Sequence, residues 1–149
     1  MADGTSDLRQ WRLWALWLIA AHTAVVAVHS VAHGVMGVIP STVFDNTVIL
    51  LCYYAGPIAA AYAISRGKEH GALLLLGSML TGFAYGFVSH FLIDGSDNVG
   101  SAGWQGWGFA FGATSVVLAM LEALAAVIGW RLLAAGRRRS SHEAPAPTL

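Results

Sequence analysis

The sequence is poor in charged residues: only 11 % of its 149 positions are Asp, Glu, Lys or Arg, whereas 56 % are hydrophobic. A soluble domain carries about 25 % charged residues, so this chain cannot cover itself with a surface that water solvates. The composition excludes a disordered chain, a nucleic-acid-binding protein and an ordinary cytosolic enzyme. It predicts an integral membrane protein whose partner is the lipid bilayer.

Cysteine is also scarce, because the chain contains one. A single cysteine excludes a disulfide framework within the chain and any Cys-rich zinc or iron–sulfur site that the chain builds alone. A polar site in this protein must therefore use other side chains.

Long apolar stretches are present, and each approaches the roughly 20 residues that cross the hydrocarbon core as a helix. There are four, at about residues 14–38, 43–65, 72–93 and 108–130. We therefore predict an all-α membrane protein, a four-transmembrane-helix bundle within a single domain of residues 1–136. Residues 137–149 have too few apolar groups to fold and are predicted to form a disordered cytoplasmic tail.

The basic residues are distributed asymmetrically. All eight lie before the first stretch, between the second and third, or after the fourth, and they are Arg9, Arg12, Arg66, Lys68, Arg131, Arg137, Arg138 and Arg139. Lys and Arg favour the cytoplasmic side of a membrane. The pattern predicts a multi-pass protein of the cell (plasma) membrane with both termini in the cytoplasm.

Histidines follow a helical spacing in the first span. His22, His29 and His33 are seven and four residues apart and so share one helix face. The third span ends with His90 and Asp94, which are again four apart and, like the pair His29 and His33, are followed by glycine. The shared frame His-x-x-x-(His/Asp)-Gly is compatible with two parallel helical-hairpin repeats.

The two pairs also match in depth. When each span is centred on the bilayer, the helical rise of about 1.5 Å per residue brings both pairs to the outer half of the membrane. Three imidazole nitrogens and one carboxylate suit Zn²⁺, Cu²⁺ or Fe²⁺. We therefore predict a transition-metal site near the extracytoplasmic face, formed by His29, His33, His90 and Asp94.

Two further residues are expected around this site. Asp97 is expected as an additional ligand or as the group that orients a histidine ring, and Tyr85 is expected to line the same cavity. Packing remains the alternative for each histidine taken alone, because an imidazole in a membrane helix can simply bond to a neighbouring helix.

A second polar pair is expected deeper in the bundle. His22 and Glu122 fall at the same level on spans that run in opposite directions. A carboxylate at that depth must be neutral or partnered, so we predict a hydrogen bond between the two side chains. The pair is a candidate proton relay toward the outer site, or a structural bond that fixes the helix register.

Two local patterns predict irregular or close packing. Pro57, directly after Gly56, predicts an interruption of the second span. Gly82 and Gly86 in the third span form a small-x-x-x-small frame, which is typical of helices that approach closely.

A metal site of this kind indicates a redox, hydrolase or metal-handling component. The His-x-x-x-His motif together with another His and an Asp is similar to the ligand set of seven-span membrane zinc hydrolases such as the alkaline ceramidases, although the similarity covers one short motif and the number of spans differs. Catalytic residues are not assigned by this motif.

Two other functions fit the same residues. A b-type haem carrier would use a histidine of the first span and His90 as axial ligands. A small proton-coupled transporter would use Glu122, and a non-catalytic subunit of a larger membrane complex would need no chemistry at all. A four-span chain has a small interior, so a homo-oligomer or a larger complex is expected.

The topology can be tested by cysteine labelling. We expect a cysteine placed at Ser101 to react with a membrane-impermeant reagent from the outside, and one placed at Ser141 to react only from the cytoplasm. Labelling of Ser101 from the cytoplasmic side alone would overturn the orientation.

Overall fold

The structure is a computed structural model that describes residues 4–39 and 42–143, and side chains over 7–39 and 42–138. All regular secondary structure among the described residues is helical, and no strand occurs among them. Its elements are α1 (Gly4–Met36), α2 (Val43–Val48), the π-helix η1 (Ile49–Ala55), α3 (Gly56–Ser65), α4 (His70–Phe87), the π-helix η2 (Val88–Leu92) and α5 (Gly106–Glu143).

These elements form four helices that are long and apolar enough to cross a membrane, which confirms the predicted number of spans. The segments α2, η1 and α3 follow one another without a break, as do α4 and η2. The candidate spans are Asp7–Met36, Val43–Ser65, His70–Leu92 and Gly106–Arg138.

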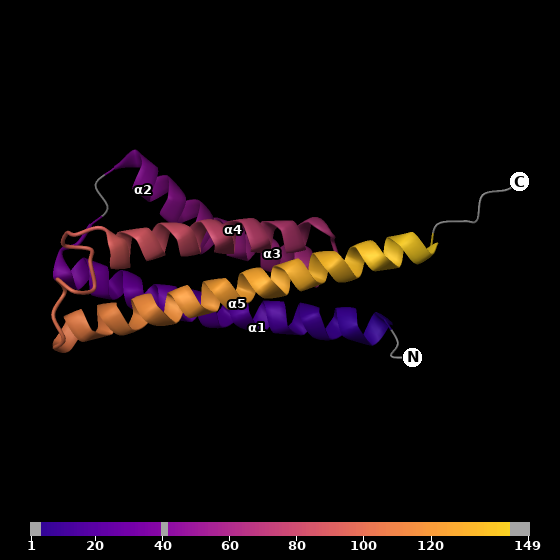
Figure 1. Ribbon diagram of the computed structural model, residues 1–149, viewed down its shortest axis with the longest axis horizontal. Coiled ribbons are helices and arrows are strands. Elements are labelled where there is room, and N and C mark those ends of the chain that lie inside the picture. The colour runs from indigo at the N-terminus through magenta and orange to yellow at the C-terminus, as the bar shows by residue number, and fades with distance from the viewer. Residues whose placement is uncertain (1–3, 40–41, 144–149) are drawn as a thin grey trace, which may run out of the picture.

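The four spans run along one common axis (Figure 1). Helix α5 packs along both α1 and α4, and α3 packs on α4. Helix α1 begins and α5 ends at the same end of the bundle, as an even number of spans requires (Figure 1). The turn between α3 and α4 also lies there, since a Cβ added to Gly67 would be 3.4 Å from the Arg12 guanidinium. The basic segments therefore share one end.

The bundle carries large apolar side chains on its outside. Trp17, Phe44 and Met120 are 72 %, 68 % and 68 % exposed, whereas His22 and Glu122 inside the bundle are 0 % and 2 % exposed. Such a surface suits hydrocarbon, in which every buried polar group must be satisfied within the protein. The interior polar residues are therefore the places to look for function.

The second span changes its helical spacing at Pro57. The backbone N–H of Gly56 donates to the carbonyl of Leu51, five residues back, which is the π-helical spacing of η1. Pro57 has no N–H to donate and stands in the first turn of α3, where none is needed. The interruption expected at Pro57 thus takes the form of a π-helix followed by a new α-helix.

The last helix is longer than the sequence predicted. Helix α5 continues to Glu143, so residues 137–143 are helical where a disordered tail was expected, and residues 144–149 lie outside the described residues. The run Leu132, Leu133, Ala134, Ala135 has high helix propensity, and elongation of an existing helix adds one hydrogen bond per residue.

A glycine substitution tests the packing of α3 on α4. A Cβ on Gly56 would lie 2.6 Å from the carbonyl oxygen of Leu51 and 2.7 Å from Cβ of Ser78. We expect Gly56→Ala to destabilise the protein by about 1–3 kcal/mol, because backbone must move to admit the methyl group. Thermal unfolding in detergent measures the effect.

The matched control is Gly77→Ala in α4, where an added Cβ meets no atom within 4 Å. We expect this variant to unfold at or above the wild-type temperature, since alanine is favoured over glycine in a helix by about 1 kcal/mol. Equal unfolding temperatures for both variants would contradict the described contact between α3 and α4.

Candidate metal centre

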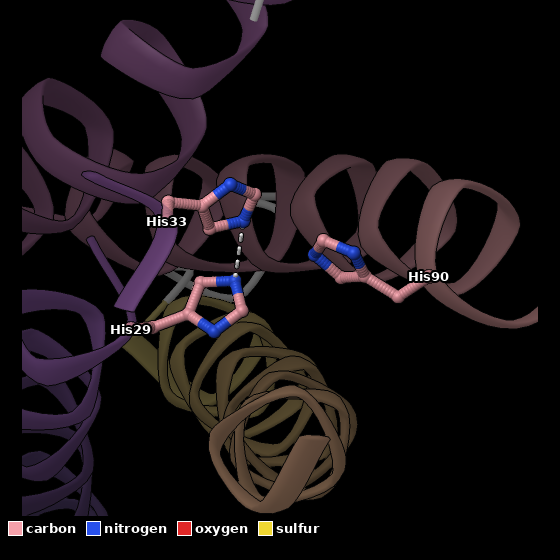
Figure 2. A group of neighbouring side chains, drawn as sticks. All are labelled: His29, His33 and His90. Carbon is pink, nitrogen blue, oxygen red and sulfur yellow. Dashed lines mark hydrogen bonds between the residues drawn. The ribbon is translucent and has the colours of Figure 1, made fainter. Parts of the chain in front are cut away.

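Three histidines converge at the end of the bundle opposite the basic segments. His29 and His33 lie one turn apart near the end of α1, and His90 lies on η2. One ring nitrogen from each lies within 4.8 Å of the others. His29 and His90 are buried and His33 is partly buried, and their rings turn toward a common point (Figure 2).

Backbone carbonyls hold the outer nitrogen of two of these rings. His33 Nδ1 donates to the carbonyl of Val38 at 2.8 Å, and His90 Nδ1 donates to the carbonyl of Asp97 at 2.9 Å. A carbonyl oxygen accepts and cannot donate, so each Nδ1 carries the proton. The neutral ring then has its lone pair on Nε2.

Thr114 on α5 contacts the third ring. Its hydroxyl lies 2.9 Å from His29 Nδ1 and 2.7 Å from the carbonyl oxygen of Ala110. A hydroxyl can accept from an imidazole N–H or donate to an unprotonated ring nitrogen, so this contact is compatible with both neutral tautomers of His29. His33 and His90 present an unprotonated Nε2 when they are neutral.

The inner nitrogens are close together. His29 Nε2 and His33 Nε2 are 3.1 Å apart (Figure 2). The two atoms form a hydrogen bond when one of them carries a proton, and without that proton a metal ion between them would remove the repulsion of their lone pairs. Ligand atoms about 2.0–2.1 Å from a tetrahedral Zn²⁺ are roughly 3.3 Å apart, so the spacing fits a shared metal ion.

Asp97 adds a carboxylate to the cluster. Its Oδ1 lies 3.4 Å from His33 Nε2 and 3.3 Å from His90 Nδ1. This oxygen is buried and is without a hydrogen-bond partner among the described residues. A buried, unpartnered carboxylate oxygen is costly, and a cation at the three nitrogens would stabilise it.

Asp94 does not join the group, contrary to the sequence analysis. Its side chain is exposed, and it follows the end of η2 at Leu92. Ile93 is already extended, with φ −92° and ψ 125°, so the interval of four residues no longer returns to the face of His90. The chain instead turns back through residues 94–96 and brings Asp97 to the histidines.

Phe111 on α5 forms the back wall of the cluster. It is completely buried, and its ring centroid lies 5.1, 5.0 and 5.2 Å from those of His29, His33 and His90. The histidines are therefore closed off on the α5 side.

A cavity opens on the other side, between α1, the second span and η2. Its volume is about 590 Å³, and both Tyr85 and Asp97 line it. The hydroxyl of Tyr85 donates to Asp45 Oδ1 at 2.9 Å, so it ties α4 to α2 rather than touching a histidine. Helix α2 leans away from the bundle at this end (Figure 1).

The predicted contact between His22 and Glu122 is confirmed. His22 Nε2 lies 3.3 Å from Glu122 Oε1, and both side chains are buried. The other nitrogen, His22 Nδ1, is buried and has no hydrogen-bond partner among the described residues.

Two contributors were missed by sequence reasoning. Thr114 and Phe111 come from the fourth span, and both residue types are ordinary in a membrane helix. Their position opposite the face of His29 could have been found only by fixing the rotation of α5 against α1.

Comparison with protein-family models, curated protein sequences and solved structures found no match. The function is therefore argued from the geometry of the cluster.

The protonation pattern of the rings can be measured without any metal. We expect ¹⁵N NMR of the metal-free, histidine-labelled protein to show a protonated Nδ1 in His33 and His90 at a pH where the imidazoles are neutral. His70, which is exposed, provides the reference signal of a histidine ring in contact with solvent. A bare Nδ1 on His33 or His90 would contradict the bonds to Val38 and Asp97.

Proposed function

We propose that this membrane protein binds a transition metal ion, Zn²⁺ in the first place, through Nε2 of His29, His33 and His90. The observation that carries the proposal is the convergence of one ring nitrogen from each histidine to within 4.8 Å of the others, with Nδ1 of His33 and Nδ1 of His90 each donating to a backbone carbonyl. Partners that fix the tautomer of a metal-ligating histidine are typical of metal sites.

The donor set favours a limited range of metals. Three imidazoles with a nearby carboxylate suit Zn²⁺ and also fit Fe²⁺ and Cu²⁺, whereas Mg²⁺ and Ca²⁺ prefer oxygen ligands. Asp97 is the fourth member of the site, either as a ligand or as a base beside the open position. It replaces Asp94 in this role.

The cavity beside the cluster supports hydrolysis over a redox or metal-handling role. Three protein ligands leave the fourth position of a zinc ion free, and a zinc ion there lowers the pKa of bound water to about 7. Phe111 closes the α5 side and the cavity opens on the other, so substrate and water would reach the site through the cavity. The carboxylate of Asp97 lies on that open side.

The packing of the rings supports a metal ion over haem. A haem with two axial histidines needs a flat slot between the two imidazoles. The centroids of His29 and His90 are 5.1 Å apart, and Phe111 packs against both rings. A porphyrin would have to displace Phe111 and His33.

The site would face away from the cytoplasm. It lies at the end of the bundle opposite the basic segments, and Lys and Arg favour the cytoplasmic side. With this orientation, metal reaches the cluster from the extracytoplasmic side and both termini stay in the cytoplasm.

Metal analysis of the detergent-purified protein tests the proposal. We expect about one transition-metal ion per chain after loading with Zn²⁺, and none in the His33→Ala, His90→Ala double variant, because one remaining imidazole cannot hold the ion. His70→Ala, which changes an exposed histidine, is the control and should keep its metal.

The two aspartates provide a sharper comparison. We expect Asp97→Asn to weaken metal binding by about 10–100-fold, as loss of a supporting carboxylate does elsewhere. Asp94→Asn should bind as the wild type does. Full metal content in the double histidine variant, measured with normal membrane insertion, would end the proposal.

A further inference from the structure

The buried His22–Glu122 pair lies next to the wall of the cavity. Tyr53 on η1 stacks beside His22, with ring centroids 6.0 Å apart and an interplanar angle of 23°. The same tyrosine lines the cavity that contains the histidine cluster. One phenol ring therefore separates the deep pair from the site.

Two glycines of α4 make room for these groups. A Cβ on Gly82 would lie 3.1 Å from Glu122 Oε1 and 3.7 Å from Tyr53 Cζ. A Cβ on Gly86, one turn further, would lie 2.6 Å from the hydroxyl of Tyr53 and 3.9 Å from Cδ2 of His90. The carboxylate, the phenol and the imidazole of His90 thus follow one another along a groove in α4.

The hydroxyl of Tyr53 is held in this groove by one bond, which it donates to the carbonyl of Gly82 at 2.8 Å. Its oxygen keeps lone pairs that can accept a proton. A hydroxyl that accepts from one side and donates to the other is able to pass a proton on. The unpartnered Nδ1 of His22 shows that the pair itself is not saturated with hydrogen bonds.

We propose that Tyr53 carries protons between the buried His22–Glu122 pair and the cavity of the histidine cluster. In each transfer the Tyr53 oxygen forms a bond to a proton from the pair, while its own hydroxyl proton leaves its hydrogen bond to the Gly82 carbonyl and passes to water in the cavity. The tyrosine is unchanged at the end, one proton has moved, and no electron is transferred. The reverse transfer reloads the pair.

The surroundings of the pair contain further titratable groups. Cys52 and Tyr53 on η1 and His90 on η2 lie close enough to Glu122 for an electrostatic interaction. Cys52 does not line the cavity, and His90 belongs to the cluster itself. Tyr53 lines the cavity and shares the space above Gly82 with the carboxylate of Glu122.

Proton exchange measures this connection directly. The metal-free protein, labelled with ¹⁵N-histidine and reconstituted in bilayers, is transferred to D₂O, and exchange of the His22 ring proton is followed by NMR. We expect Tyr53→Phe to slow this exchange by about 10²-fold, the scale of losing one positioned proton carrier. Comparison with a His22→Gln variant assigns the resonance.

The matched control is Tyr54→Phe. Tyr54 is the neighbouring residue of η1 and also lines the cavity, and its hydroxyl forms a 2.7 Å hydrogen bond with the hydroxyl of Ser30. We expect it to exchange at the wild-type rate. Slowing in both variants would show a general loss of access and overturn the specific role of Tyr53.

A second variant guards against misfolding of Tyr53→Phe. Gly86→Ala keeps the phenol but places a methyl group where its hydroxyl lies, and it should slow exchange as well. Wild-type exchange rates in both Tyr53→Phe and Gly86→Ala would disprove the path. Because the exchange measurement needs no metal, it can disprove the proposed proton path without affecting the proposed metal site, and metal analysis can disprove the metal site without affecting the proton path.

Discussion

Hydrocarbon offers no hydrogen-bond partner, so each polar group buried in these spans must be satisfied by the chain itself. Most of them are. Thr114 and Ser115 bond to carbonyls of their own helix, and Tyr53 bonds to Gly82. The exceptions among the described residues are Asp97 Oδ1, beside the histidine cluster, and His22 Nδ1 in the deep pair. The metal ion that we propose would stabilise the first, and the second belongs to the pair for which we propose a proton path.

Helix ends, rather than helix faces, orient the rings of the cluster. Helix α1 ends at Met36 and is followed by Gly37, whose φ of +70° suits a residue without Cβ, and the N–H of Val38 donates to the carbonyl of His33 at 3.0 Å. The carbonyl of Val38 accepts in return from the ring of His33. The loop after α1 thus fixes the orientation of the His33 ring through two hydrogen bonds with Val38.

The same device recurs at His90 with different loop geometry. The N–H of Val99 donates to the carbonyl of His90 at 2.9 Å, and the ring of His90 donates to the carbonyl of Asp97. The shared frame His-x-x-x-(His/Asp)-Gly therefore marks two helix ends at which the loop returns to a histidine. This explains why the frame predicted His33 and His90 correctly without predicting the residue four positions after His90.

What the sequence could predict depended on regular helices. The hydropathy predicted four spans, the interval of four placed His29 beside His33, and depth alone paired His22 with Glu122. The prediction for Asp94 depended on helical geometry continuing to that residue, although the predicted span ended at residue 93 and the dipeptide Asp94-Gly95 favours a turn. The roles of Thr114 and Phe111 required the rotation of α5, which a pattern in one helix does not contain.

Gly82 and Gly86 of α4 make room for side chains, whereas their spacing indicates close contact with a second helix backbone. A small-x-x-x-small frame predicts that two helix backbones approach closely. At Gly82 and Gly86 the space is instead filled by polar ends of side chains, the carboxylate of Glu122 and the hydroxyl of Tyr53. A larger residue at either position would push a polar group out of the interior. Gly82 and Gly86 therefore leave room for a row of polar groups along α4, which runs from Glu122 through Tyr53 to His90.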